Sequence, residues 1–358
     1  MTKLVKKKRL SVDARFEFIR FLVAIGVSLL VALALIFMVS KEPFQALNYL
    51  FLGPFAKFRK IGNIIETAIP LTYLGLSVSI MFAANQFNLG SSGAFFIGGT
   101  VAAIIGLTLP LPSFIHPLFA LLAAGVLGGL WTSIPALLKL KFNASELVSS
   151  LMLNFIAFNI SIYIIMNYFR DLNAGTLASE KFMSTILLPN LIPGTRVSYG
   201  LIILIIMILL SWLFVSKTKW GYALRMTGLN TNFAKFSGIS TAAVVLYSQF
   251  IGGFLAAMGG ATEMLSLYDR FKWQMMPSYA FDGIIVSVLA KEKPQYIPLA
   301  ALVLAYIRVG ADTMSFNGDV SFEMITIIQG FIIILIAANA FLKKYRQKMV
   351  VKEATTND

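Results

Sequence analysis

The chain has 358 residues, of which 58% are hydrophobic and only 13% are charged. Soluble domains usually carry about 25% charged residues, so this composition indicates an integral membrane protein in contact with lipid. The lack of cysteine excludes disulfides and thiolate metal sites, and the single histidine, His116, excludes a multi-histidine metal site. The formal net charge of +14 does not by itself indicate a nucleic-acid partner, because the placement of the charges decides what they do.

Apolar segments of about 20 residues, the length of a membrane-spanning helix, recur along the whole chain. The first follows Lys6, Lys7, Lys8 and Arg9, as the core of a signal peptide would. It is longer than such a core and no A-x-A cleavage site follows it, so we expect a retained span. The sequence predicts an all-α membrane protein with about ten transmembrane helices, some short or broken, at residues 18–39, 64–84, 93–109, 115–138, 147–169, 198–216, 241–262, 281–290, 295–311 and 322–342.

Ten spans place both termini on one side of the membrane, and positive charge identifies that side as the cytoplasm. With the N-terminus inside, 20 of the 30 Lys and Arg residues but only 6 of the 16 acids fall on the cytoplasmic side. We therefore predict a basic cytoplasmic arm (1–17), a single transmembrane domain (18–342) and a cytoplasmic tail (343–358).

The basic residues Lys57, Arg59 and Lys60 are an exception, because they fall in the first outside loop. They end an amphipathic stretch, residues 47–60, that Pro54 interrupts. We expect this stretch to form a helix on the outer membrane surface, in preference to an error in the topology.

The chain lacks the motifs of common catalytic sites. It has neither a G-x-x-x-x-G-K-[ST] phosphate-binding loop nor a G-x-S-x-G nucleophile motif, so we expect no catalytic residues and no enzyme activity of its own. Carboxylates within spans would mark an ion pathway, but Glu66, Glu263, Asp282 and Glu323 lie near predicted span ends, where solvation or capping is the simpler role. This argues against an ion-coupled carrier without excluding one.

A polar segment, Phe82–Gly93, interrupts two apolar spans with amides and glycines, in the order FAANQFNLGSSG. A helix broken within the membrane is tolerated where its backbone lines a cavity or is buried in protein. Asn85, Gln86 and Asn88 would then offer hydrogen bonds to a polar, uncharged solute. The alternative is an ordinary cytoplasmic turn with Gly90 and Gly93 at positive φ, and the sequence does not decide between the two.

The short predicted spans at 281–290 and 295–311 suggest a second break. If they form one broken unit, it would mirror the break near Asn88 and give an inverted repeat of two five-helix halves.

A second polar segment, residues 217–238, carries four positive charges and no acid. Leu224, Leu229, Phe233 and Phe236 recur at helical spacing, which predicts one short amphipathic helix over 224–236 that docks into a groove on a cytoplasmic partner. The alternative is a basic loop that touches anionic lipid headgroups.

Both segments resemble, in order and spacing, the permease family of ATP-binding-cassette (ABC) importers for ribose, branched-chain amino acids and nucleosides. The first is similar to that family's Phe-Asn-Ile-Gly element, and the second to its Gly-x-x-x-Arg-x-x-Gly-x-Asn element. The resemblance covers about residues 40–340, and it is carried by Phe87-Asn88-Leu89-Gly90, by Gly221, Arg225, Gly228 and Asn230 followed by Ala234 and Gly238, and by further similar segments at 138–146, 152–154, 252–260 and 281–290.

The resemblance implies a division of labour between several chains. A permease dimer would form the path in a bacterial cytoplasmic membrane, cytoplasmic ATPases would use ATP, and an external binding lipoprotein would deliver the solute. This chain would contact lipid but bind no metal or cofactor and no nucleic acid. Implied substrate-path residues are Asn85, Gln86, Phe87, Asn88, Gly90 and Asn154, and implied coupling residues within the coupling loop 217–240 are Gly221, Arg225, Gly228, Asn230, Phe233, Ala234 and Gly238.

The nucleoside subgroup of this family is the most similar, which implies purine or other nucleosides as substrates and a heterodimer with a second permease. Simple sugars such as ribose, and less readily ion-coupled transport, remain alternatives. The family's usual Glu-Gly-Gln triplet is replaced here by Ser92-Gly93-Ala94, so substrate contacts of those Glu and Gln side chains cannot be transferred to this chain.

Overall fold

The computed structural model describes residues 30, 33–38, 40–276, 279–318, 320, 324, 327 and 330. The all-α prediction is confirmed for them, since they contain no strand beyond two isolated antiparallel bridges. The helices are α2 (Pro43–Phe51), η1 (Gly53–Phe55), α3 (Phe58–Ala83), α4 (Ser91–Thr108), α5 (Ile115–Phe142), α6 (Glu146–Tyr168), α7 (Gly200–Lys217), α8 (Lys219–Leu229), α9 (Thr231–Phe236), α10 (Thr241–Leu267), α11 (Tyr279–Leu289), η2 (Pro294–Tyr296) and α12 (Ile297–Asn317).

Seven of the described helices are long and apolar enough to cross a membrane, namely α3, α4, α5, α6, α7, α10 and the segment Pro294–Asn317. They match seven of the predicted spans. The predicted eighth span is α11, whose 11 residues are fewer than the about 17 that cross the hydrocarbon core alone. The first and tenth predicted spans lie mostly, and the basic arm and the tail entirely, outside the described residues. The count of ten and the inverted repeat therefore stay predictions.

The chain divides into two compact units, one with the residues up to Pro54 and from Ile307, the other Phe55–Tyr306. In the first unit, α2 packs on the second half of α12. Gly310 lies so close to the Leu50 carbonyl that an added Cβ would be 2.2 Å from its oxygen. The amphipathic stretch predicted at 47–60 differs from the structure, because α2 ends at Phe51, Pro54 lies in η1, and α3 starts at Phe58.

The second unit is built around α10, which packs against α3, α4 and α5. Small residues let the backbones approach closely, as is common between membrane helices. A Cβ on Gly260 would lie 1.9 Å from the Phe95 carbonyl oxygen, and one on Gly98 would lie 2.0 Å from that of Ala257. The crossing of α4 and α10 thus has room only for glycine at these two positions.

Helices α6 and α7 cover the outside of this unit, and only 28% and 22% of the residues in their most apolar windows are buried. The exposed side chains at the centre of α7 are all aliphatic: Ile202, Ile205, Ile206, Leu209 and Leu210. An exposed surface of this kind is stable in contact with lipid rather than water, which agrees with a membrane-spanning role.

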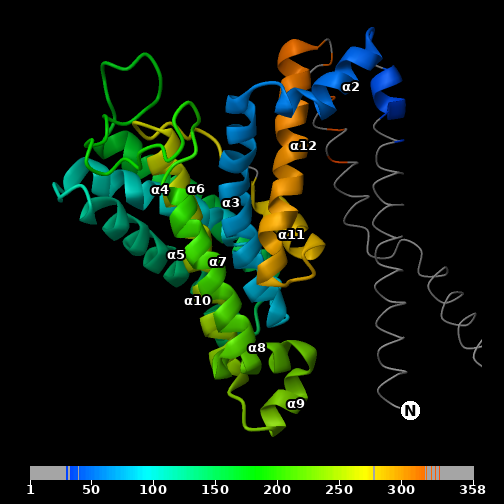
Figure 1. Ribbon diagram of the computed structural model, residues 1–358. Helices are drawn as coiled ribbons and strands as arrows, with labels where there is room; N and C mark the ends of the chain where they lie inside the picture. The colour runs from blue at the N-terminus through cyan, green and yellow to red at the C-terminus, as the bar shows by residue number, and fades with distance from the viewer. Residues whose placement is uncertain are drawn as a thin grey trace, which may run out of the picture. The chain divides into compact units, whose positions relative to one another are not determined.

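One end of the second unit carries α8 and α9, and the connection from α6 to α7 lies at the opposite end (Figure 1). The single helix predicted over 224–236 is wrong. Asn230 has an extended backbone (φ −158°, ψ 103°), and its side chain accepts a hydrogen bond from Phe233 N, so it ends α8 and caps α9. Leu224 is fully buried whereas the Phe236 side chain is 92% exposed, so the apolar residues do not share one face.

The glycine contacts between α4 and α10 lead to a test of the fold. Gly260→Ala should destabilise the protein by about 1–3 kcal/mol, because the added methyl forces two backbones apart. Gly175→Ala is the matched control, since nothing lies within 4 Å of its added Cβ. Thermal unfolding in detergent, followed by tryptophan fluorescence, measures both variants. Equal melting temperatures would contradict the close packing.

Candidate substrate pocket and coupling segment

The break between α3 and α4 spans residues 84–90. Its only positive φ is at Asn85 (φ 55°), a residue type that tolerates the left-handed region. Gly90 has φ −72° and Gly93 lies within α4, so the turn with both glycines at positive φ is not formed. These glycines serve a different purpose, because a Cβ on Gly90 or Gly93 would lie 2.7 Å from an amide oxygen, that of Asn88 or Asn154 respectively.

Asn88 lies at the centre of the break and is fully buried. Its Oδ1 accepts a hydrogen bond from Gly90 N at 2.5 Å. Its Nδ2 donates to Gln249 Oε1 of α10 at 2.6 Å, and more weakly to the Thr132 carbonyl of α5 at 3.4 Å. The amide therefore ties the break to two neighbouring helices, as a buried amide must if its polar atoms are to remain satisfied.

The hydrogen bonds continue from Gln249 to a buried carboxylate. Gln249 Nε2 donates to Glu146 Oε1, and Glu146 Oε2 forms an ion pair with Lys139 Nζ at 2.7 Å. Lys139 Nζ also donates to Gln86 Oε1 at 2.5 Å, which returns the chain of bonds to the break. We call Gln86, Asn88, Lys139, Glu146 and Gln249 the polar ring.

The local structure explains why Lys139 and Glu146 meet. α5 ends at Phe142, and Asn143 directly after it adopts the left-handed conformation (φ 52°). The Ser145 side chain then caps α6 by accepting a hydrogen bond from Val148 N. Glu146 is thereby the first residue of α6, where a carboxylate is stabilised by the helix dipole.

A second set of bonds joins the break to α6. Asn154 Nδ2 donates to the Leu89 carbonyl at 2.9 Å, and Asn154 Oδ1 accepts from Gly93 N at 2.9 Å. Ser150 Oγ accepts from Leu89 N at 3.1 Å. Backbone groups that the broken helices leave open are thus satisfied by side chains of α6.

The structure brings together four of the expected substrate-path residues, Gln86, Asn88, Gly90 and Asn154. Asn85 and Phe87 are exposed, and the Phe87 ring lies 5.0 Å from that of Phe82. Direct contact of any of the six with a solute stays a prediction. Lys139, Glu146 and Gln249 were not expected here, and the signal available for Gln249 was a lone amide in the apolar run of α10.

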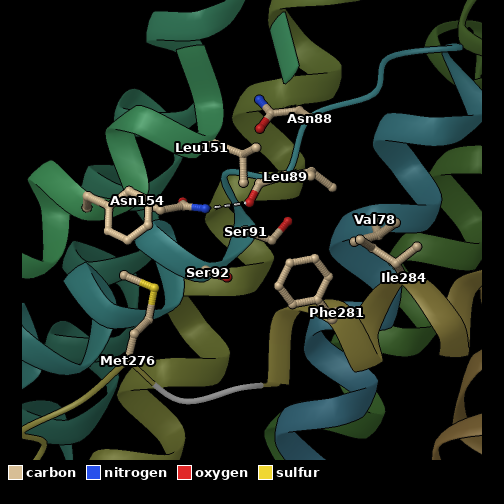
Figure 2. A pocket seen from close by; sticks show the side chains of 11 residues that line it. Val78, Asn88, Leu89, Ser91, Ser92, Leu151, Asn154, Met276, Phe281 and Ile284 are labelled. Atoms are coloured by element: carbon tan, nitrogen blue, oxygen red, sulfur yellow. Dashed lines mark hydrogen bonds between the residues drawn. The ribbon is translucent and has the colours of Figure 1, made fainter. Parts of the chain in front are cut away.

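A pocket of about 150 Å³ opens beside the break, between the start of α4, α6 and α11 (Figure 2). In Figure 2, Asn154 lies on one side of the pocket, where it bonds to Leu89, and Phe281 lies on the other side. Ser91 and Ser92, in the first turn of α4, lie between them. The side chains around it include no acid and no base. The lining residues are Val78, Asn88, Leu89, Ser91, Ser92, Leu151, Asn154, Phe155, Met276, Phe281 and Ile284.

Three of the acids considered for an ion pathway can be placed. Glu263 and Asp282 are buried, which contradicts the solvation expected for them. Asp282 does lie near a helix end, in the first turn of α11. Glu66 is half-buried in α3. None of the three lines the pocket. Glu323 lies outside the described residues.

The expected coupling residues divide into packing and surface positions. Gly221 and Gly228 allow close backbone contact, because a Cβ at either would lie 2.1 Å from a carbonyl oxygen, that of Phe214 or Ala83. Arg225 donates to the Val215 carbonyl, and Ala234 is buried. Gly238, two residues after the end of α9, has a positive φ of 82°. The exposed apolar side chains on α8 and α9 are Trp220, Tyr222, Leu229, Phe233 and Phe236.

The contact between Gly228 and Ala83 places α8 directly against the end of α3. Gln86 of the polar ring follows three residues later. A displacement of α8 would therefore act on the break, and through it on Asn88 and Leu89 at the pocket.

Asn154 gives a test of this architecture. Asn154→Ala leaves two buried backbone groups, Leu89 O and Gly93 N, without their partner, and we expect a loss of about 1–3 kcal/mol of stability for each. Asn173→Ala, at an exposed loop position, is the control. The thermal midpoint in detergent should fall for Asn154→Ala only. An unchanged midpoint would show that the hydrogen bonds of the Asn154 side chain do not stabilise the break.

The comparisons with known proteins agree with the resemblance seen in the sequence. The family model described as the branched-chain amino acid transport system permease component matches residues 60–337. The guanosine ABC transporter permease NupP of Bacillus subtilis is 28% identical over 305 residues, which cover 84% of this chain and 88% of the relative. No solved structure matches the chain.

Two further relatives differ in their named substrates. The glucose ABC transporter permease TsgB13 of Haloferax volcanii is 27% identical, with 85% of this chain and 83% of the relative covered. The nucleoside ABC transporter permease NupB of Lactococcus lactis is 26% identical, with coverage of 90% and 91%. All three are named as permeases and none as an enzyme. The chain therefore belongs to the family of branched-chain amino acid transport system permease components, and it is a multi-pass membrane permease subunit of the ABC type.

Proposed function

We propose that this chain forms part of the translocation path of an ATP-driven importer for nucleosides. The observation that carries the proposal is the uncharged, mostly apolar pocket at the α3–α4 break, in a chain whose relatives include permeases named for guanosine and for nucleosides. The orientation follows from the charge distribution, with both termini and the α8–α9 segment in the cytoplasm.

The pocket chemistry supports a flat, neutral ligand. Phe155, Phe281 and Met276 offer apolar and aromatic surface for a base to contact, and such surfaces dominate small-molecule sites. Ser91 and Ser92 add hydroxyl groups at the start of α4, where backbone N–H groups of the first turn point out of the helix. No charged partner is needed for a neutral nucleoside.

A simple sugar is the second candidate, and the glucose permease of Haloferax volcanii supports it. A sugar exposes several hydroxyl groups, and each one buried needs a hydrogen-bond partner. The two amides at the pocket, Asn88 and Asn154, already bind protein groups. A nucleoside also carries a ribose with hydroxyl groups, but its flat base can contact the aromatic rings of Phe155 and Phe281, which a simple sugar leaves unused, and this favours the nucleoside.

Transport itself needs no chemistry in this chain. A cytoplasmic ATPase would bind the exposed side chains of α8 and α9, and its ATP-dependent closure would move α8 against the end of α3. The break would transmit this movement to Asn88 and Leu89 at the pocket, so that the pocket opens alternately to the two sides of the membrane. An external lipoprotein would deliver the solute, and a second, different permease would complete the path.

Uptake into proteoliposomes tests the function. Vesicles that contain this chain, its ATPase and the second permease should accumulate labelled guanosine when ATP and the binding lipoprotein are present. Accumulation without ATP, driven by a sodium or proton gradient, would instead show an ion-coupled carrier. Accumulation of ribose or glucose but not guanosine would favour the sugar alternative.

The exposed aromatic residues of α9 yield a prediction about the ATPase. Exchange of both Phe233 and Phe236 for alanine should weaken ATPase binding at least about tenfold, because large aromatic side chains often dominate interfaces. Phe114→Ala is the control, since the Phe114 side chain is 87% exposed, close to the 92% of Phe236, but precedes α5. Co-purification of the ATPase measures the effect. Equal recovery with both variants would place the ATPase elsewhere.

Phe281 yields a prediction about the substrate. Phe281→Ala should raise the guanosine concentration for half-maximal uptake by about 5- to 100-fold, the effect expected from losing one base–aromatic contact. Phe281→Tyr keeps the ring and should stay near wild type. An unchanged half-saturation for the alanine variant would remove this ring from the nucleoside site.

A further inference from the structure

The exposed face of α6 differs from the exposed faces of α5 and α7. Along it lie Phe155, Asn159 and Tyr163, four residues apart and hence on one side of the helix. Phe155 is 66% and Tyr163 61% exposed, and Asn159 is exposed as well. In α5 and α7 the exposed residues of the central turns are all apolar.

Asn159 lies close to the middle of the membrane. It is two residues beyond the centre of the 23-residue helix, about 3 Å along the axis. Its Nδ2 donates to the Phe155 carbonyl at 2.7 Å within the same helix. Among the described residues, its Oδ1 accepts no hydrogen bond. An amide oxygen facing hydrocarbon at this depth is unfavourable, so a protein surface is the environment that suits it.

The same face borders the pocket. Leu151, Asn154 and Phe155 line the pocket from α6, and the largely exposed Phe155 belongs to both surfaces. The wall that α6 contributes is therefore incomplete on its outer side. A helix packed against Phe155 and Asn159 would close the pocket at that side.

We propose that the face of α6 formed by Met152, Phe155, Asn159 and Tyr163 is the seam with a second permease subunit, which completes the substrate pocket. The inference rests on the proposed function. Lipid does not fit this face, because it offers no donor to Asn159 Oδ1 at mid-depth. A membrane helix of a second permease with a polar side chain would supply this donor. Its contact with Phe155 would place the solute between the two permeases.

Photo-crosslinking tests the seam. Tyr163→p-benzoylphenylalanine is compared with the same exchange at Leu209, an exposed residue of α7, in membranes of the cell that produces the full complex. The variant at Tyr163 should form an adduct several-fold more abundant than the one at Leu209. Mass spectrometry should identify the captured chain as a second, different permease of this family, and capture of another copy of this chain would overturn that choice of partner.

Two outcomes would overturn the seam. Equal yields at both positions would show that α6 faces lipid as α7 does. An adduct confined to this chain's own residues 1–29 or 331–358 would show that the chain covers the face itself.

Asn159 provides the second measurement. Asn159→Leu should weaken association with the second permease about 3- to 10-fold, the range expected for one hydrogen bond between membrane helices, and Asn159→Gln should restore it. Association of the leucine variant at wild-type strength would contradict the role of the amide.

Failure of the seam and failure of the proposed function can be told apart. ATP-dependent guanosine uptake without a permease adduct at Tyr163 would refute the seam alone. Loss of ATP dependence in wild-type vesicles would refute the importer, whatever the crosslinks show.

Discussion

The structure depends on one constraint, that backbone polar groups within a membrane protein must find partners inside the protein. The break between α3 and α4 opens several such groups, and the Asn88 and Asn154 amides satisfy them. Because each amide sits where a glycine Cβ would collide with it, the sequence needs Gly90 and Gly93 as much as it needs the amides. The hydrogen bond from Gly93 N to Asn154 fixes the first turn of α4, whose Ser91 and Ser92 line the pocket.

The polar ring extends that constraint across four segments. Gln249 of α10 lies between Asn88 and Glu146, so the break, α5, α6 and α10 share one set of hydrogen bonds. Partly satisfied buried networks are unfavourable, so these segments are expected to move together. Since Gly228 of α8 contacts the carbonyl of Ala83 at the end of α3, a movement that begins in α8 reaches the pocket over a short path.

Of the ten spans predicted from apolar runs, seven match described helices, because hydrocarbon imposes both the length and the composition of a span. The same reasoning could not place Asn230, whose capping of α9 divides the predicted coupling helix in two. It also missed Gln249, since a single amide in an apolar run says nothing about which helix it faces. Asn88 stood out because its segment interrupts two apolar spans with amides and glycines, but its partners Gln249 and Thr132 lie far away in the chain. Those contacts arise only from packing.

The central claim is that the pocket at the break holds the nucleoside. The chain contains no cysteine, so Ser92→Cys would carry its only thiol, at the pocket wall. The account predicts that guanosine slows modification of this thiol by a maleimide in the assembled, nucleotide-free complex, and that glucose does not. A modification rate that guanosine leaves unchanged, in a variant that still binds guanosine, would contradict it.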